Sequence, residues 1–367
     1  MYDLAIIGAG ISSLVLCFEL KKSGYKGSII VLEAGRKPGG RLSSKYSRTK
    51  PLLRINHGCP KINLSIEDHF TKNYLKWFLN ENLIIEDKLS PNNHFFNDSS
   101  FKTYCSYDLV DEIYSKLRLH KDVFFKFGTF ISELKKSNDI WVLNDESNNL
   151  SHKTKYLVLS SSLLLHKRSL SILNKKIIPM RKAIKANNDT KIDILLSLVN
   201  KQRIVKRKNI ILHCDYDFSL FNNERYKIIE LPNYSMKMNG IERIMITNHI
   251  DNSISIVIHT IDKYMYRKYL FNKYNGILLE KNITNYLTNT IKDDYIKYFV
   301  KNINYRIMTW RGSQSLRIKV NKKLNYSQIN KVGFCGDWFN NNENGSVRSS
   351  IVSAVKLSKK ILYLEKS

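Results

Sequence analysis

Cysteine and proline are scarce in this sequence, and this scarcity excludes several kinds of small protein. The 367 residues include 5 cysteines and 6 prolines. The cysteines show no CxxC pair and no spacing typical of zinc ligands, and they are Cys17, Cys59, Cys105, Cys214 and Cys335. We therefore expect reduced thiols rather than a disulfide framework, and we expect no metal site.

Long apolar runs are also absent. No stretch approaches the roughly 18 consecutive apolar residues that a membrane-spanning helix requires. The segment Met1–Phe18 is apolar, but it has no basic leading region and it contains Asp3, unlike a secretory signal. These features predict a cytoplasmic protein without a transmembrane segment.

Acidic residues are few compared with basic ones. Lys and Arg number 60, Asp and Glu number 32, and the formal net charge is +28. Such a charge suits nucleic-acid binding, but lysine is abundant along the whole chain, as A+T-rich codon usage produces. The run Lys206-Arg207-Lys208 lies among apolar residues and forms no basic helix face. We expect a small-molecule substrate, preferentially anionic, and no nucleic-acid partner.

The N-terminal residues have the pattern of a βαβ unit. Tyr2–Ile7 is a short apolar run that ends at a glycine, and Ile11–Lys22 has apolar residues at helical spacing. Ser28–Leu32 is a second apolar, β-branched run, and it ends at Glu33. Strand, turn, helix and parallel strand are therefore expected.

The turn inside this unit is typical of dinucleotide binding. Gly8 permits a tight bend, and Gly10 lets a diphosphate approach the backbone at a helix N-terminus, where amide donors are unpaired. Ser13 occupies the third glycine position of the GxGxxG fingerprint, where Gly or Ala is usual. Glu33 ends the next strand, at the position where an acidic residue contacts the ribose. The alternative is an ordinary glycine turn without a ligand.

A second glycine-rich segment follows. It consists of Glu33-Ala34-Gly35-Arg36 and Gly39-Gly40-Arg41, and it brings two guanidinium groups to the same region. These residues resemble the FAD signature of renalases, flavin-containing amine oxidases and protoporphyrinogen oxidases. The resemblance implies FAD, with Glu33 on the adenosine ribose and Arg41 near the diphosphate. The cofactor-binding residues expected here are Gly8, Gly10, Ile11, Ser12, Ser13, Glu33, Ala34, Arg36, Gly40, Arg41 and Leu42.

Three further segments carry the resemblance. Asn56-His57-Gly58-Cys59 is similar to a turn that passes close to the flavin ring in this family, although Asn56 replaces an aspartate. Tyr156–Ser162 resembles the strand that leaves the FAD domain, which would bring Ser160 near the cofactor. Ile131 occupies a position where the family has a β-branched residue on the adenine, and the sequence alone favours an ordinary core role for it.

The C-terminal end carries another motif. Gly336-Asp337, followed by Gly345-Ser346-Val347, resembles the segment that closes the flavin site. Asp337 is expected to accept hydrogen bonds from cofactor hydroxyls, and the helix that begins near Ser346 is expected to direct its first amides at the flavin. Trp310-Arg311 is similar to a pair in renalase-like chains. The candidate catalytic residues are His57, Trp310 and Arg311, with a structural histidine and a surface cation–π pair as alternatives.

The expected fold is α/β, with a Rossmann-type, glutathione-reductase-like FAD-binding domain of parallel sheet plus β-meander and a second α+β substrate domain. Residues 1–77, 103–165 and 326–367 are expected to form the first domain, and residues 78–102 and 166–325 the second. Expected helices are Ile66–Leu79 and Ser346–Leu364, and expected strands are Val123–Ile131 and Ile140–Leu143 of the meander, Lys155–Ser160, Ile192–Leu198, Ile254–Ile258 and Val332–Cys335.

The resemblance implies a renalase-like, FAD-dependent oxidoreductase. It would transfer a hydride to FAD from a reduced nicotinamide nucleotide isomer or an amine, and pass the electrons to oxygen or another acceptor. Asn340–Asn342 stand where monoamine oxidases place an aromatic residue, which argues against a monoamine oxidase substrate. No cysteine lies between Trp310 and Phe334, which implies non-covalent FAD. Two alternatives stay open, a flavin-free NAD(P)-binding dehydrogenase and a non-enzymatic basic protein that binds nucleotides or nucleic acid.

Overall fold

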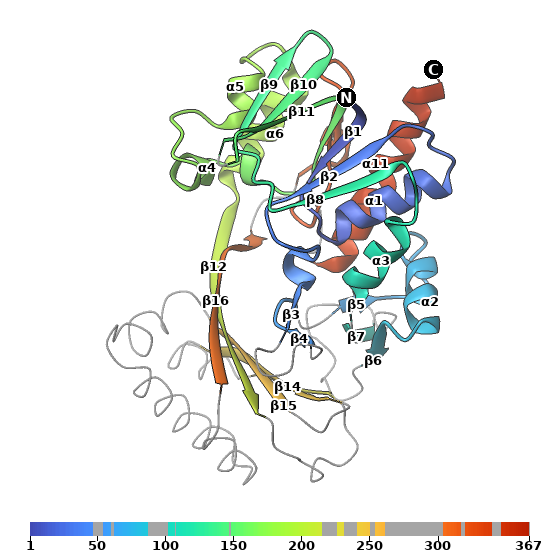
Figure 1. Cartoon of the computed structure of the whole chain (residues 1–367), viewed down its shortest axis with the longest axis vertical. Helices are drawn as coiled ribbons and strands as arrows, with labels where there is room; N and C mark the ends of the chain where they lie inside the picture. The colour runs from blue at the N-terminus through green and yellow to red at the C-terminus, as the bar shows by residue number, and fades with distance from the viewer. Residues whose placement is uncertain are drawn as a thin grey trace.

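The computed structural model contains a large mixed sheet covered by helices and a second, antiparallel sheet beneath it in the view of Figure 1. It describes residues 1–46, 54–59, 62–86, 102–106, 108–146, 148–214, 226–230, 241–249, 254–260, 304–316, 320–339 and 346–366. All structural statements below concern these residues.

The N-terminal βαβ unit is confirmed. Strands β1 (Tyr2–Ile7) and β2 (Ile29–Glu33) are parallel, with Leu4 opposite Ile29, and helix α1 (Ile11–Lys22) connects them. The consecutive buried apolar residues 4–6 of β1 and 29–32 of β2 are typical of a parallel sheet covered on its two faces.

The large sheet has the order β17-β18-β11-β1-β2-β8, and β11 also pairs with a meander of β10 and β9. The β1, β2, β8, β11 and β18 strands are parallel, whereas β9, β10 and the first half of β11 are antiparallel. The further bounds are Val123–Phe127 (β8), Glu133–Ser137 (β9), Ile140–Asp145 (β10), Leu150–Leu159 (β11), Tyr326–Ser327 (β17) and Val332–Phe334 (β18). The predicted parallel sheet with an added β-meander is therefore the observed fold.

One predicted meander strand was wrong in its partner and its length. The segment Val123–Ile131 forms β8 only as far as Phe127, and β8 pairs in parallel with β2. Gly128 then adopts a positive φ of 67°, and its amide donates to the Gly35 carbonyl at 2.8 Å. The left-handed conformation at Gly128 ends the strand, and the next amide, that of Thr129, donates to the Glu33 carbonyl at the end of β2 at 2.9 Å.

Helices cover the two faces of this sheet. Leu4 and Ile6 of β1 pack with α1, α3 (Leu109–Leu117) and α11 (Val347–Lys366). Ala5, between them, faces the opposite core, which the meander shares with residues of α5 (Pro179–Ala183) and α6 (Thr190–Lys201). This alternation follows from the two-residue repeat of a strand. Each fully buried leucine or isoleucine contributes about 1.5–3 kcal/mol.

The segment Ile192–Leu198 was predicted as a strand and is wrong, because it lies inside α6. Its buried residues follow the helical spacing, and they are Ile192, Leu195, Leu196 and Val199. Asp189 caps the helix, since its side chain accepts hydrogen bonds from the amides of Lys191 at 3.0 Å and Ile192 at 3.2 Å. The sequence analysis overlooked Asp189 as an N-cap residue, which marks the start of a helix.

The second sheet is antiparallel, with the order β13-β14-β15-β12-β16. Its bounds are Arg203–Cys214 (β12), Tyr226–Glu230 (β13), Ile241–Asn248 (β14), Ile254–Thr260 (β15) and Asn304–Leu316 (β16), and the predicted strand Ile254–Ile258 is confirmed. Strands β12 and β16 of this sheet run side by side and extend up toward the large sheet (Figure 1). Ile55 packs on this sheet against Ile211, Met245 and Val257.

Short elements fill the space between the glycine motifs and α3. They are 3₁₀ helix η1 (Gly40–Leu42), strands β3 (Ser44–Tyr46), β4 (Arg54–Asn56), β5 (Ile62–Leu64), β6 (Ile84–Glu86) and β7 (Lys102–Ser106), and helix α2 (Lys72–Asn80). The predicted helix Ile66–Leu79 begins six residues late, at Lys72, because Asp68 forms a turn. The Asp68 carboxylate accepts from the Phe70 amide and the Thr71 hydroxyl.

The predicted division into domains stays a prediction, and the packing favours a different second boundary. Leu164 and Leu165 of η2 (Leu163–Leu165), together with Met180 and Leu195, share a core with Leu157. This places η2, α5 and α6 against the large sheet, so we place the start of the substrate domain near Gln202 rather than at residue 166.

Candidate functional site

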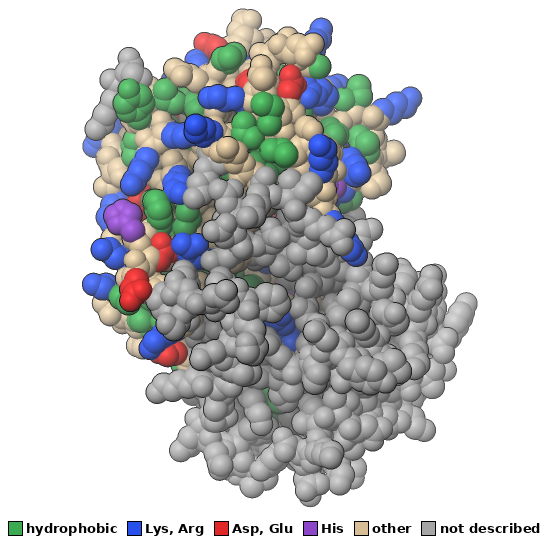
Figure 2. Space-filling view, turned by 180° about the vertical axis from the view of Figure 1, so that it is seen from behind, with side chains coloured by type: hydrophobic (Ala, Val, Ile, Leu, Met, Phe, Trp, Pro, Cys, Tyr) green, Lys and Arg blue, Asp and Glu red, His purple; other side chains and the backbone are tan. Residues whose placement is uncertain are grey.

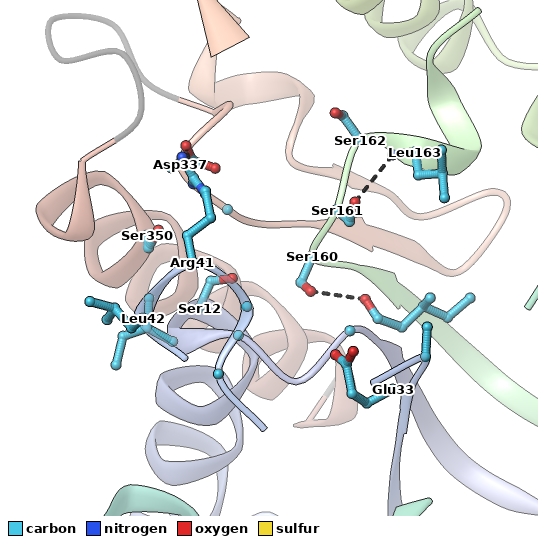
Figure 3. Close-up of a pocket in the computed structure, with 18 of the residues that line it drawn as sticks. Ser12, Glu33, Arg41, Leu42, Ser160, Ser161, Ser162, Leu163, Asp337 and Ser350 are labelled. Atoms are coloured by element: carbon cyan, nitrogen blue, oxygen red, sulfur yellow. Dashed lines mark hydrogen bonds and ion pairs between the residues drawn. The ribbon is translucent and has the colours of Figure 1, made fainter. Parts of the chain in front are cut away.

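A pocket of about 310 Å³ lies where strands β1, β2 and β11 end and helix α1 begins. This is the edge of a parallel sheet at which α/β proteins bind their ligands. The lining includes fifteen of the predicted residues, which are Gly8, Gly10, Ile11, Ser12, Glu33, Ala34, Gly40, Arg41, Leu42, Ile131, Ser160, Gly336, Asp337, Ser346 and Val347. The two ends of the chain therefore contribute to one cavity (Figure 3).

The glycine turn opens α1 toward the pocket. Gly8 has a positive φ of 100° and donates to the Leu32 carbonyl at 2.8 Å, which joins the turn to β2. Gly10 is the N-cap of α1, and a side chain there would meet no atom within 4 Å. With no side-chain cap, the first amides of α1 and the positive end of its dipole are suited to an anion.

Glu33 ties the two glycine motifs together. One carboxylate oxygen accepts from the Ala9 amide and the other from the Gly35 amide, both at 2.7 Å. Gly39 in turn donates to the Ala9 carbonyl at 2.9 Å. The carboxylate is thus fixed at the end of β2, on the wall of the pocket.

Arg41 and Asp337 form an ion pair across the pocket and face each other in Figure 3. Arg41 lies in η1, and Asp337 follows β18. Gly336, with a φ of 129°, lets the chain turn there, since a Cβ would lie 2.6 Å from the Ser160 carbonyl oxygen. The Gly336 amide donates to the Ser353 hydroxyl of α11 at 2.9 Å, which fixes the turn.

The start of α11 differs in detail from the prediction. Ser346 and Val347 line the pocket, but the Ser346 hydroxyl accepts from the Ser349 amide at 3.0 Å. Ser346 therefore acts as the N-cap of this helix. Ile131 lines the pocket while being buried, so its core role and its cofactor role are compatible.

Five of the predicted cofactor residues do not line this pocket. Ser13 is completely buried within α1, Arg36 is exposed, and His57 is buried beside the second sheet, where its carbonyl accepts from the Asn209 amide group at 2.5 Å. The Asn56 side chain donates to the Ser106 carbonyl.

Gly58 is packed against the Arg41 backbone, where a Cβ would overlap the carbonyl oxygen. The 56–59 turn thus supports Arg41 from behind, and Cys59 alone of it reaches the pocket.

Trp310 and Arg311 lie in β16, where Trp310 pairs with Arg207 of β12. Their side chains lie outside the described residues, as do Asn340–Asn342 and Gly345. Their roles stay predictions.

The sequence analysis missed part of the lining. The missed residues are Ile7, Leu32, Gly39, Cys59, Thr129, Phe130, Ser161, Ser162, Leu163, Leu164, Arg168, Ile204 and Ser350. Arg168, the first residue of α4 (Arg168–Ile172), is the notable one, because it adds a second cation to the cavity. Burial lowers the pKa of its guanidinium, Asp337 raises it and Arg41 lowers it. No motif marks this position, although it follows the β11 strand that was expected to pass near the cofactor.

On the face of the molecule seen in Figure 2, the described basic side chains do not gather into a single patch. Lys and Arg are spread over the described part of that face, with uncharged side chains between them. In the described ranges, no helix has the length and apolar content needed to cross a membrane, and no cluster of three His, Cys, Asp or Glu side chains forms a metal site. Cys17 and Cys335 are free thiols.

The fold and the pocket together define a dinucleotide-binding protein of the Rossmann type, with a second domain on an antiparallel sheet. A family model for the NAD(P)-binding Rossmann-like domain matches residues 6–74. Over 58 residues, 16% of this chain, the sequence is 40% identical to (S)-6-hydroxynicotine oxidase from Paenarthrobacter nicotinovorans. That match spans only 13% of the length of the relative.

Solved structures resemble the whole chain. A double mutant of putrescine oxidase, made to redesign its cofactor binding, aligns with a TM-score of 0.60 at 11% identity, over 99% of each chain. A candidate protoporphyrinogen oxidase from Exiguobacterium sp. 255-15 aligns with a TM-score of 0.58 at 8% identity, again over 99% of each chain. At these identities the likeness establishes the fold alone, and the Rossmann-type sheet with its helices is the fold class predicted above.

Proposed function

We propose that the pocket binds FAD non-covalently and that the protein is an FAD-dependent oxidoreductase of small organic molecules. The observation that carries the proposal is the convergence of both chain ends on one cavity, with the α1 N-terminus, Glu33 and Arg41 from one end and Asp337 and Ser346 from the other. A site for a shorter nucleotide would not require the C-terminal segment.

The residues present fit this cofactor. The uncapped amides of α1 and the Arg41 guanidinium are suited to the diphosphate. Glu33, at the end of β2, is suited to the hydroxyls of the adenosine ribose. Asp337, whose side chain is 12% exposed, would accept from hydroxyls of the flavin side chain. Gly10 leaves open space where a Cβ would otherwise narrow the cavity.

When bound, FAD supplies the oxidising chemistry, and the protein positions it. The large sheet and its turns orient the cofactor, and the second sheet, which reaches the pocket through Ile204 of β12, is the proposed substrate side. Trp310 and Arg311 remain the proposed catalytic residues there, whereas His57 is buried outside the pocket lining and would act only through its neighbours. Because oxidation of a bound molecule by FAD requires chiefly its orientation and the exclusion of water, few reacting side chains are needed.

For the substrate, we propose an amine or an isomer of a reduced nicotinamide nucleotide, with oxygen or another acceptor taking the electrons. Two of the similar proteins are named for hydroxynicotine and putrescine, which are both amines. The nicotinamide isomer follows from the renalase-like motifs of the sequence. The high positive charge favours an anionic substrate, and therefore the nicotinamide nucleotide over an amine, which is cationic near pH 7.

Purification tests both halves of the proposal. We expect a yellow protein that releases intact FAD on denaturation, and an anaerobic panel of amines, NADH isomers and tetrapyrroles in which at least one bleaches the flavin absorption. A colourless protein that takes up added NAD or NADP but no FAD would contradict the cofactor. A yellow protein that no compound bleaches would contradict the substrate classes and leave the cofactor standing.

A further inference from the structure

We propose that Arg168 and Ser162 form a second phosphate-binding subsite, which contacts the diphosphate of the bound dinucleotide together with Arg41 and α1. No motif of the sequence assigns Arg168, and Ser162 was expected only as the end of the segment that leaves the FAD domain. The inference rests on the proposed function in one respect, since it takes the diphosphate of the dinucleotide as the anion.

The geometry of Arg168 directs it into the pocket. Its Nη2 lies 3.4 Å from the Ser162 hydroxyl, and both residues line the cavity. Its Nε is buried and has no hydrogen-bond partner in the described structure. Its backbone amide donates to Nδ1 of His166 at 3.1 Å, and the His166 ring also contacts the Gln202 carbonyl at 3.1 Å. The backbone is therefore anchored while the guanidinium keeps donors free for a ligand.

The acidic side chains of the pocket are already engaged by other groups, which leaves the Arg168 guanidinium available to an anionic ligand. Glu33 is engaged by two backbone amides, and Asp337 is paired with Arg41. The ion pairs of the described residues include none with Arg168, although Asp337 lies close enough to raise the pKa of its guanidinium. A partly buried guanidinium whose Nε has no hydrogen-bond partner is unfavourable, and an anionic ligand offsets that cost.

A phosphate suits this subsite better than a carboxylate of the substrate. The planar guanidinium matches two phosphate oxygens, and a serine hydroxyl provides a further donor. The lining near Arg168 comes from Ser160–Leu164 and Gly336-Asp337, on the side of the large sheet, while the described part of the second sheet adds only Ile204. Figure 3 shows Ser160, Ser161 and Ser162 entering from the end of β11, whereas Ser12 enters from α1. The diphosphate would thus be bound from two different elements.

The test compares Arg168→Gln and Arg168→Lys with Arg181→Gln, a matched control whose guanidinium pairs with Asp193 outside the pocket. Titrations would use FAD, ADP-ribose as the diphosphate without a flavin, and riboflavin as the flavin without phosphate. We expect Arg168→Gln to weaken FAD and ADP-ribose by the same factor, about tenfold to a hundredfold, as for a lost hydrogen bond to a charged group. Arg168→Lys should lose less, and riboflavin affinity should not change.

Stability of the ligand-free protein provides a second measurement. If the role of Arg168 is to bind an anionic ligand, Arg168→Gln should leave the melting temperature unchanged or raise it, because a partly buried charge is removed. Equal FAD and ADP-ribose affinity in Arg168→Gln and wild type would overturn the proposal, and so would a lower melting temperature with affinities unchanged. A wild type that ignores FAD contradicts the proposed function instead, and the ADP-ribose titration still decides the role of Arg168.

Discussion

At the scale of single residues, Gly8 and Ser160 show how closely two distant parts of the chain approach at the pocket. Gly8 has a φ of 100°, a conformation that favours glycine. The Ser160 hydroxyl lies in the space that a Cβ on Gly8 would need, and it donates to the Ile7 carbonyl at 2.8 Å. The end of β11 can therefore lie against the turn only because position 8 has no side chain.

We predict that Gly8→Ala destabilises the protein through two separable effects. The left-handed backbone costs about 1–2 kcal/mol, and the new Cβ would lie 2.6 Å from the Ser160 hydroxyl oxygen. Gly24→Ala is the matched control, because Gly24 also has a positive φ, of 84°, but no atom within 4 Å of its Cβ position. Denaturant unfolding should show a larger loss for Gly8→Ala than for Gly24→Ala, with the difference removed in Gly8→Ala/Ser160→Ala. Equal losses for the two glycine variants would contradict the predicted steric overlap.

At the scale of elements, an ion pair between Lys182 and Glu133 attaches helix α5 to the meander. Lys182 of α5 donates to Glu133 of β9 at 2.6 Å, and the Asn144 amide group of β10 donates to the same carboxylate at 2.9 Å. These contacts, with the Lys182 hydrogen bond first among the causes, lower the pKa of Glu133 to about 2. The Glu133 side chain is 11% exposed, so solvent screens the group only in part.

This shift predicts a pH dependence with a defined sign. The folded pKa of about 2 lies below the ordinary value of 4.5, so the contribution to stability is complete above pH 4.5 and is lost as the pH falls toward about 2. Both Glu133→Gln and Lys182→Met should therefore reduce the fall in unfolding free energy across that window. The double variant should fall about as steeply as Glu133→Gln alone, since that substitution already removes the carboxylate with which Lys182 interacts. Independent, additive effects of the two substitutions would show that the pair is not the cause.

At the scale of the whole molecule, the two ends of the chain close on each other. Helix α11 packs on α1, and β18 lies beside β11 in the large sheet. Arg348 of α11 donates to Asp68 at 2.6 Å, and Arg41 pairs with Asp337. The nucleotide site is therefore complete only after the last residues of the chain have folded against the first.

We predict that Arg41 and Asp337 are energetically coupled across this closure. Arg41→Gln, Asp337→Asn and the double variant form a double-mutant cycle, and the coupling in unfolding free energy without FAD should be about 0.5–3 kcal/mol. The side chains are 28% and 12% exposed, which favours a measurable interaction over a screened surface pair. Additive single-variant effects would mean that the pair does not stabilise the contact between the two ends.

Local sequence determined the elements around the pocket. The glycine turn between two apolar runs, Glu33 at a strand end and the glycines around Arg41 each have a conformational reason that lies within a few residues. The same local reasoning predicted the parallel sheet with its meander and the C-terminal helix. It was wrong for Ile192–Leu198, where an N-cap at Asp189 and helical spacing were overlooked, and for the start of α2, where a turn at Asp68 delays the helix.

Tertiary structure alone decided which residues meet. The support of Arg41 by Gly58, the pairing of Arg41 with Asp337 and the entry of Arg168 into the cavity join segments far apart in the chain. No local pattern encodes such contacts, because they depend on how strands are ordered in a sheet and how closely two backbones approach. The sequence thus determined the chemistry available for binding a dinucleotide, and the packing of the folded chain decided which charges surround it.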